Sequence, residues 1–549
     1  METDQTFVLH APDARSVVLV VDRGGSITHY DAARRGATWL TTATAHHGDD
    51  YWYEVDGVGP LLDPHAADLR WADDGPRSVV RTSWPSQPSL STRTADPVIY
   101  EMHVRGFART FAGVQQRLDH LVDLGVNVIE LMPVHPFDAS HNYWGYMPLL
   151  WGAVHRSFAA DEAFAPEELA ALVAAAHARG IEVWLDVVFN HTGEGDATLP
   201  TRCLRGIDDA HAYRHHPDGR YIDDSGCGND ANPADPEIRR LVIESLDRFA
   251  TLGIDGFRFD LASLLTRDDG GMVEMITAWS RRRNVRLIAE PWDLAAYQVG
   301  SHLWSAEWMQ WNDRFRDDVR GFLRAEAGLV AAMVQRVQGS PDLFGPGSVV
   351  SGDVVSGSVV SGSVALRSVN FITAHDGLTM HDLTVVTSDR HRSWDCGPEL
   401  RLQQLQNYFT VLLLSAGSPM FVMGDEFART QGGHDNPYNV DSEVSWVDWG
   451  RLDEWRELYE FVQRLLRLRR EAMGATVTCF GVDGPPDTTY ESRSLAWQSG
   501  DLYVMVNAWW QPLTFVVQVP GNWQVVAASA ATDGRTVAPR SSVVLRRGA

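Results

Sequence analysis

Two short runs of sequence decide the fold: Gly-Phe-Arg-Phe-Asp at residues 256–260 and Leu-Ile-Ala-Glu-Pro-Trp-Asp at residues 287–293. In these runs an apolar strand ends at a carboxylate, Asp260 or Glu290. Asp376 ends a third apolar run, at residues 369–376, in the same way. Parallel barrels carry their chemistry at the carboxyl ends of their strands. Three acids placed this way suggest glycoside chemistry, in which one carboxylate attacks, a second protonates the leaving oxygen and a third sets the field around them.

The alternation around these runs predicts an α/β protein with a closed (β/α)8 TIM barrel over residues 96–472. Strands are expected at 98–104, 127–132, 181–189, 255–260, 285–290, 369–376 and 419–426. Helical segments lie between them, and strand–helix–strand repeats imply a parallel sheet. The clearest helix starts at Pro166 and ends before Gly180, with one apolar face. That face consists of Leu169, Leu172, Val173 and Ala176. The last barrel helix is expected at 454–470.

At both ends of the chain, the sequence predicts short strands separated by turn-forming residues. Residues 7–10, 17–21 and 51–57 predict an N-terminal β-sandwich over residues 1–95. Residues 502–507 and 513–519 predict a C-terminal β-sandwich over residues 473–549. The sequence Val-Val-Ser-Gly occurs three times between residues 349 and 362, and a repeat this short is expected to be a surface insertion.

Composition excludes several classes of partner. With 72 acidic and 47 basic residues the net charge is −25, which argues against nucleic acid or an anionic membrane. No apolar run reaches the roughly 18 residues of a membrane span, and the N-terminus has no signal-peptide pattern. The four cysteines lack metal-ligand spacing, which argues against a zinc site, and so few thiols are typical of a cytoplasmic protein. No acidic loop dedicated to calcium is seen, and we expect no metal and no cofactor. Cys203 and Cys227 share one expected loop and could form a disulfide.

The residues at the strand ends have chemical roles that follow from their placement. Arg258 and Asp260 point to the same side of a strand, where the cation would keep Asp260 ionised as a nucleophile; a structural ion pair is the alternative. Partial burial of Glu290 would raise its pKa and keep it protonated as an acid. His375, beside Asp376, could grip sugar hydroxyls. His191 either does the same or is a satisfied core histidine.

Four runs, ending at His191, Asp260, Glu290 and Asp376 in this order, resemble those of the α-amylase superfamily of glycoside hydrolases. The resemblance implies that Asp260 is the nucleophile, Glu290 the general acid/base and Asp376 the transition-state stabiliser. It also implies that further residues bind substrate. Those candidates are Tyr146, His191, Arg258, His375, Trp144 and Trp292, with Tyr146 and Trp144 in the stacking segment 142–146.

Further runs are similar to those of isoamylases and bacterial glycogen debranching enzymes. They lie at residues 100–107, 226–232, 260–263, 289–293, 311–317 and 393–397. This resemblance implies hydrolysis of α-1,6 branch linkages in glycogen, amylopectin or branched maltodextrin, with retention at the anomeric carbon. Retention requires about 5–5.5 Å between the carboxyl groups of Asp260 and Glu290. The N-terminal sandwich, with residues 11–14 and 62–64, resembles the carbohydrate-binding module that such enzymes carry. The loop 377–393 is shorter than debranching enzymes usually have.

Two other classes of function are weighed against debranching. The first is another enzyme of the superfamily: an α-1,4-acting amylase, a branching transferase or a trehalose-forming hydrolase. The second is a non-catalytic glucan-binding protein. Such a protein usually lacks one of the catalytic acids, whereas this sequence has all three.

Overall fold

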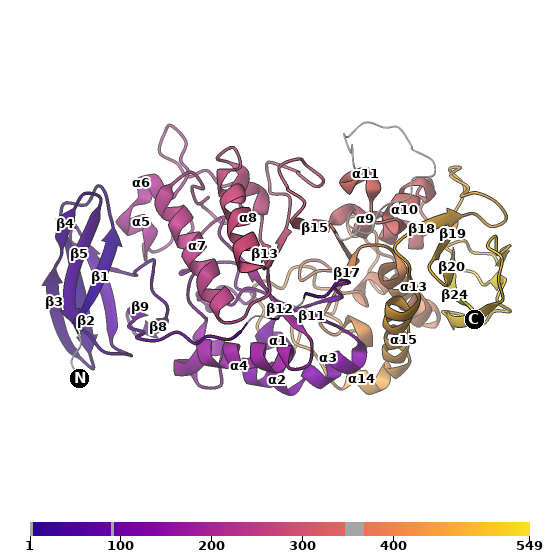
Figure 1. Ribbon diagram of the computed structural model, residues 1–549, viewed down its shortest axis with the longest axis horizontal. Helices are drawn as coiled ribbons and strands as arrows, with labels where there is room; N and C mark the ends of the chain where they lie inside the picture. Colours follow the sequence, from indigo (N-terminus) through magenta and orange to yellow (C-terminus); the bar gives the residue numbers. More distant parts are fainter. Residues whose placement is uncertain (1–3, 89, 91–92, 346–366, 549) are drawn as a thin grey trace.

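The computed structural model describes residues 4–88, 90, 93–345 and 367–548. The barrel lies in the middle of an elongated molecule, with antiparallel sheets at either end (Figure 1). The Val-Val-Ser-Gly repeat falls outside the described residues, so its expected character stays a prediction.

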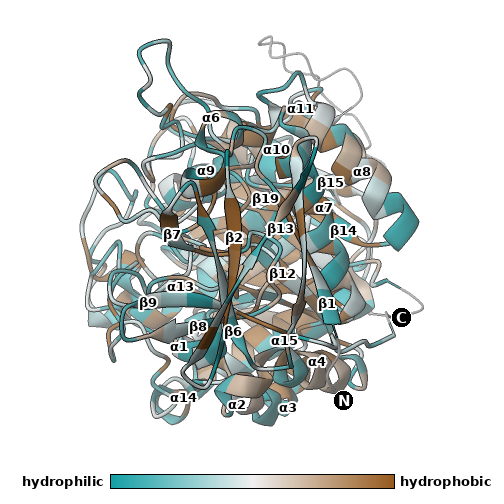
Figure 2. Ribbon diagram, turned by 90° about the vertical axis from the view of Figure 1, so that its left-hand side faces the viewer, coloured by the Kyte–Doolittle hydropathy of each residue, from teal (hydrophilic) through white to brown (hydrophobic). Residues whose placement is uncertain are grey.

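Two antiparallel sheets pack together at the N-terminal end. One is β1 (Asp4–His10), β5 (Thr38–Thr44) and β4 (Ala33–Arg35). The other is β3 (Ser26–Asp31), β2 (Val17–Arg23), β6 (Asp50–Val55), β9 (Gly75–Val79) and β8 (Leu69–Ala72), with β7 (Val58–Leu61) paired to β6. Phe7 of the first sheet meets Tyr51 of the second at a ring-centroid distance of 5.1 Å. Figure 2 shows β2 as a strongly apolar strand, as expected for a strand whose side chains fill this core.

Eight parallel strands close into the barrel. In order they are β10 (Ile99–Met102), β11 (Val128–Leu131), β12 (Glu182–Val187), β13 (Gly256–Phe259), β14 (Arg286–Ala289), β15 (Trp308–Asn312), β16 (Ser368–Phe371) and β17 (Ser418–Val422). Closure is made by β10 pairing with β17, where Ile99 lies opposite Met420. The predicted TIM barrel is confirmed.

The sequence reasoning missed strand β15. Its five residues are Trp-Met-Gln-Trp-Asn; the two tryptophans favour a strand, but the run has no β-branched side chain and no regular apolar–polar alternation, so the strand signal is mixed. Two of them are polar and fully buried, and each makes a tertiary hydrogen bond. Gln310 accepts from the Gly300 N–H at 2.8 Å, and the Asn312 amide donates to Ser368 at 2.9 Å. Those partners are distant in sequence, so local pattern could not reveal them.

Helices surround the barrel. The longer ones are α1 (Val104–Ala108), α2 (Phe111–Gln116), α3 (Leu118–Leu124), α4 (Ala165–His177), α7 (Pro236–Thr251), α8 (Gly271–Arg283), α9 (Asp313–Leu323), α10 (Val330–Val337), α13 (Pro398–Leu414) and α15 (Arg456–Ala472). Single turns are α5 (Leu204–Ile207), α6 (Asp209–Ala212), α11 (Pro341–Phe344), α14 (Arg451–Glu454), η1 (Arg156–Phe158), η2 (Glu162–Phe164), η3 (Ala262–Thr266), η4 (Asp382–Thr384) and η5 (Asp425–Phe427). The predicted helices at 166–179 and 454–470 correspond to α4 and α15. All four apolar-face residues predicted for α4 are buried.

The C-terminal strands form a sheet of five and a pair. The sheet is β18 (Val477–Phe480), β19 (Ser494–Ser499), β20 (Leu502–Asn507), β24 (Ser541–Arg547) and β22 (Trp523–Ala528); the pair is β21 (Leu513–Thr514) and β23 (Thr536–Val537). The predicted strand 513–519 is therefore much shorter. One face of the sheet packs on barrel helices, where the Trp497 indole N–H donates to the Leu414 carbonyl at 2.9 Å.

The element bounds support the three-part organisation. Strand β9 ends at Val79 and the barrel begins at Ile99, while α15 ends at Ala472 and β18 begins at Val477. We propose 1–95, 96–472 and 473–549 as the three domains. None of the described helices has the length and apolar character needed to cross a membrane. Cys203 and Cys227 are both free, so the disulfide considered from sequence is not formed.

Candidate active site

The carboxyl ends of the barrel strands bring the three acids to one mouth. Asp260 directly follows β13 and Glu290 directly follows β14, while Asp376 lies five residues beyond the end of β16. Parallel strands in a closed barrel end on the same side, so the three acids emerge there together. The Asp260 N–H donates to Val187 and the Glu290 N–H donates to Phe259, which continues the sheet pattern up to both acids.

Arg258 is the electrostatic centre of the site. Its side chain has no solvent exposure, and its guanidinium contacts three carboxylates. Nη1 lies 2.7 Å from Asp186 and 3.2 Å from Asp260, while Nη2 lies 2.9 Å from Glu290. The two predicted catalytic acids therefore contact adjacent nitrogens of one planar group. This supports close spacing of Asp260 and Glu290; the separation of about 5–5.5 Å stays a prediction.

Replacing Arg258 with Leu should destabilise the fold strongly. Removing one partner of a buried ion pair leaves uncompensated charge and costs about 3–5 kcal/mol. We expect the free energy of unfolding, measured in urea, to fall by about that amount. The matched control is Arg281→Leu, because Arg281 pairs with Glu307 on the surface and is 59% exposed; its loss should cost under about 1 kcal/mol. Equal losses in the two variants would contradict the central role of Arg258.

Glu290 has the properties of a proton donor. Burial raises its pKa, to about 8, although Arg258 and the Leu261 backbone N–H stabilise the ionised form. The negative charges of Asp260 and Asp376 raise the pKa further. A carboxyl group with this pKa stays protonated at neutral pH, as a general acid must be before it reacts.

Asp260 is held in a fixed orientation at the same place. Its side chain is 12% exposed, so a substrate atom could reach it. One carboxylate oxygen contacts Arg258, and the other accepts from the Asn190 amide at 2.9 Å. Two donors from two neighbouring strand ends thus orient the carboxylate without covering it completely.

Aromatic side chains form one wall beside the acids. Tyr146 is half-buried and stacks on the ring of His375, with centroids 4.8 Å apart. Trp144 meets His375 edge-on at 5.0 Å, and the Tyr146 hydroxyl donates to Asp186 at 2.6 Å. Three of the residues predicted to bind substrate therefore lie together, and Tyr146 presents a ring of the kind on which sugars stack.

His375 and Asp376 form a charged pair next to this wall. Burial opposes protonation of His375, but Glu101, whose carboxylate is 2.8 Å away, and Asp376 outweigh it and raise the His375 pKa to about 9. Asp376 is exposed to solvent. Partial desolvation by the surrounding protein opposes its ionisation, but His375 and Arg316 lower its pKa below the ordinary value. At neutral pH the pair is therefore a cation beside an anion.

His191 and Trp292 lie at the edges of this arrangement. His191 is only 1% exposed; its Nε2 contacts the Tyr146 carbonyl at 2.6 Å and its Nδ1 contacts Asn190. It therefore supports Tyr146, and the predicted sugar contact would require one of these bonds to be exchanged. Trp292 is half-buried and lines an open hollow of about 440 Å³ together with Leu294 and Tyr297. This hollow is formed largely by residues that directly follow Glu290.

Two acids in the site were not identified from sequence. Asp186 lies opposite Arg258 in the pairing of β12 with β13, and Glu101 is the partner of His375. Each is a charged residue inside an otherwise apolar strand, which was the available signal. Their role depends on strand register, which local sequence does not specify.

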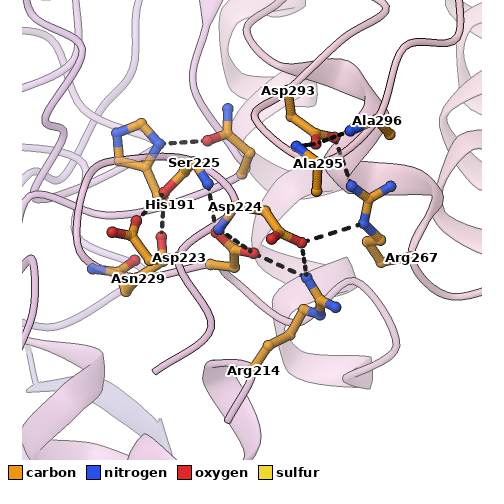
Figure 3. A network of polar contacts seen from close by, with 12 residues as sticks. His191, Arg214, Asp223, Asp224, Ser225, Asn229, Arg267, Asp293, Ala295 and Ala296 are labelled. Atoms are coloured by element: carbon orange, nitrogen blue, oxygen red, sulfur yellow. Dashed lines mark hydrogen bonds and ion pairs between the residues drawn. The ribbon is translucent and has the colours of Figure 1, made fainter. Parts of the chain in front are cut away.

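A polar network joins the loop that follows β12 to the segments that follow β13 and β14 (Figure 3). Asp224 bridges two arginines, with Arg214 at 3.4 Å and Arg267 at 3.8 Å. Arg267 in turn lies 2.7 Å from Asp293, whose carboxylate accepts hydrogen bonds from the backbone N–H groups of Ala295 and Ala296. The Leu294 N–H also donates to the Asp224 carbonyl. These contacts fix the wall of the hollow beside Glu290 to the loop that follows β12.

One group elsewhere offers ligand atoms of the kind metals bind. Asp13, Asp208 and His211 have such atoms within 4.8 Å of one another. His211 pairs with Asp208 at 2.6 Å, so an ion pair already accounts for the cluster.

Comparisons with known proteins show what the chain is similar to. The family model for the α-amylase catalytic domain matches residues 99–201. The GlgX homolog of the glycogen operon from Mycobacterium bovis is 33% identical over 550 residues, covering 89% of this chain and 74% of that protein. The chain belongs to the α-amylase family, in the group of the isoamylases and GlgX proteins.

Another member of this α-amylase family group is isoamylase SU1 of Zea mays, a chloroplastic protein. It is 33% identical over 528 residues, which cover 80% of this chain. The chain spans 65% of the length of that isoamylase. A solved structure, the pullulanase of Anoxybacillus sp. LM18-11 with maltotetraose, superposes with a TM-score of 0.83 at 24% identity. The superposition covers all of this chain and 86% of that pullulanase, and it shows that the two proteins share a fold.

Proposed function

We propose that this chain hydrolyses α-1,6 branch linkages of glycogen, amylopectin or branched maltodextrins, with retention at the anomeric carbon. The observation that carries the proposal is the contact of Asp260 and Glu290 with one buried guanidinium, together with a pKa of about 8 for Glu290. One acid is poised to attack and the other to donate a proton, which is the division of roles that a retaining glycosidase needs.

In the first step Asp260 attacks the anomeric carbon and the bond to the leaving oxygen breaks. Glu290 transfers its proton to that oxygen, so the leaving chain departs as a neutral alcohol. Asp260 is then joined to the retained glycosyl unit as an ester. Arg258, held by Asp186, keeps both acids in place while the charge moves.

In the second step water replaces Asp260 at the anomeric carbon. Glu290, now ionised, takes a proton from the water, and the C–O bond to Asp260 breaks. Two displacements at the same carbon restore its original configuration. Asp376, ionised and exposed, stabilises the positive charge that develops on the sugar in both steps.

The remaining predicted residues hold the sugar. We propose that Tyr146 lies under the sugar at the cleavage point, with Trp144 behind it and the protonated His375 donating to a hydroxyl. Trp292 would contact the leaving chain, because it lines the hollow next to the proton donor. His191 would act through Tyr146.

The choice of α-1,6 linkages has its support in relatives rather than in the acids, which every retaining α-glucosidase of this type would share. The names of the similar proteins include isoamylase and glycogen debranching enzyme. The pullulanase with the shared fold was solved with maltotetraose, an α-glucan fragment.

The short loop 377–393 packs against segment 430–433. Thr430, Gln431 and Gly433 of that segment donate hydrogen bonds to the Asp382 carboxylate.

Product analysis on glycogen tests the linkage directly. We expect linear maltooligosaccharides to be released, iodine colour to deepen, and the first product to carry the α-configuration in proton NMR spectra. The control is a linear amylose of similar chain length, which should remain intact. Loss of iodine colour with cleavage of amylose would instead assign an α-1,4-acting enzyme, and a new branch-point signal would assign a transferase.

A further inference from the structure

The C-terminal region carries a pair of stacked tryptophans at its surface. Trp509 and Trp510 follow the end of β20, and their rings lie 3.9 Å apart at an angle of 19°. Successive side chains in a strand point to opposite faces, so this stack requires the chain to leave the strand. The Trp509 N–H donates to the Asn507 side chain, which turns the chain there. Trp510 remains 53% exposed.

Arg493 lies beside the stack and does not cover the outer face of the Trp510 ring. Its guanidinium carbon is 4.9 Å from the Trp509 ring centre and 5.6 Å from that of Trp510. A cation capping either outer face would be nearer to one ring by about the ring spacing of 3.9 Å. The two distances differ by only 0.7 Å (5.6 against 4.9 Å), so the guanidinium sits at the shared edge. The face of Trp510 that points away from Trp509 is not capped by it.

The neighbouring segment adds a second exposed ring and a fixed cation. Ser494 pairs with Asn507, which brings the residues before β19 beside the tryptophans. Tyr490, in that segment, is 70% exposed. Arg493 is held in place because its Nε donates to the Ala325 carbonyl at 2.8 Å and its Nη1 to the Glu491 carbonyl at 2.5 Å. The Glu491 carboxylate lies 3.6 Å from Nη1 and the Arg493 side chain is 11% exposed, so Nη2 is the group that would meet a ligand.

We propose that Trp509, Trp510, Tyr490 and Arg493 form a surface site for an α-glucan chain, separate from the active site. This rests on the proposed function for the choice of ligand. Flat indole and phenol rings match the apolar faces of glucose units, and a fixed guanidinium donates to hydroxyls. A net charge of −25 disfavours a polyanion as the ligand.

The size of the exposed rings also favours a sugar chain over a protein. A stable protein interface needs about 800 Å² on each partner. Aromatic side chains bury 150–250 Å², so the exposed parts of Trp510 and Tyr490 supply roughly 250 Å² together. That area suits a few sugar units.

Helix α9 links the two places. Asp313 at its start lines the hollow beside Glu290, and Ala325, just past its end, contacts Arg493. The eleven residues of α9 span about 16 Å at 1.5 Å per residue. A polymer with many chains can occupy both sites at once, and the second contact then gains from a high local concentration. A short branched oligosaccharide cannot.

Glycogen binding in an Asp260→Asn background tests the site without degradation of the polymer. In affinity electrophoresis through glycogen gels, Trp510→Ala should raise the dissociation constant about 3–10-fold, while Trp510→Phe should retain part of the affinity. The control is Val516→Ala, because Val516 is 54% exposed in the same region and is not aromatic. In the active enzyme, Trp510→Ala should raise KM for glycogen by the same factor. It should leave kcat, and KM for a short branched maltodextrin, unchanged.

The outcomes separate this site from the proposed activity. Unchanged glycogen binding by the Trp510→Ala variant would overturn the inference. So would a wild-type dimer in sedimentation that Trp510→Ala converts to a monomer, because the rings would then contact a second copy of the chain. Failure of the wild-type protein to release linear chains would overturn the proposed function, whereas the gel comparison would still report on the surface site.

Discussion

Replacing Asp260 with Asn should reduce kcat by about four orders of magnitude or more. The proposed mechanism forms an ester at this carboxylate, and an amide is a far weaker nucleophile. The measurement is release of reducing ends from glycogen over days at high enzyme concentration. Binding of glycogen should persist, because Asp260 is only one of several groups in contact with the sugar.

The structure indicates what else this substitution changes. Arg258 and Asn190 each donate to one oxygen of Asp260, whereas an amide offers a single oxygen. One donor will face the new NH2 group, so a modest loss of thermal stability is expected. Thermal unfolding should therefore accompany the kinetics, with Asp119→Asn as a control, since Asp119 pairs with Arg179 on the surface and is 79% exposed. Activity of Asp260→Asn near that of this control would remove Asp260 from the mechanism.

Replacing Glu290 with Gln should lower kcat about 10²–10⁴-fold and abolish the high-pH limb of the rate profile. Wild-type kcat/KM should fall tenfold per pH unit above about pH 8, because the acid loses its proton there. The amide has no such ionisation. A substrate with a good leaving group, which needs no protonation, should recover much of the lost rate in the first step. A high-pH limb that survives in the variant would assign it to another group.

The same pKa has a consequence for stability. The folded-state pKa of Glu290, about 8, lies above the unfolded value near 4.5, so its contribution to stability is fully present below about pH 4.5 and is lost as pH rises through about 8. Gln carries no such dependence. The free energy of unfolding of Glu290→Gln should therefore rise relative to wild type between those values, by on the order of 1–3 kcal/mol. If the difference in free energy of unfolding between variant and wild type did not change with pH, the pKa of Glu290 would not be elevated in the folded protein.

Much of the fold could be predicted because the barrel strands carry a strong local signal. Apolar runs ending at carboxylates located β13 and β14, and Gly180 and Pro166 bracketed α4 closely. Strand β15 could not be predicted, since its buried amides use partners outside the strand, such as Gly300, ten residues from Gln310, and Ser368, 56 residues from Asn312. The C-terminal strand at 513–519 was predicted too long because alternating valines there pack as an irregular segment after β21.

The candidate site shows the same limit. The sequence placed Asp260, Glu290 and Arg258 at strand ends, and the structure brings them into contact. The participation of Asp186 depends on the register of β12 against β13, which only the closed sheet fixes. The contact of His191 with the Tyr146 carbonyl depends on the path of a loop 45 residues earlier, which no local pattern encodes.

The electrostatic link between Glu290 and Asp260 would let the site reset itself between half-reactions. The charge of Asp260 is one cause of the elevated pKa of Glu290. In the proposed mechanism a glycosyl group is esterified to Asp260; that charge is then gone, and the affinity of Glu290 for a proton must drop. The residue that began as a donor is thereby biased to remain deprotonated until water arrives. Hydrolysis of the ester restores the charge and draws the proton back, so the catalytic cycle drives its own alternation of acid and base.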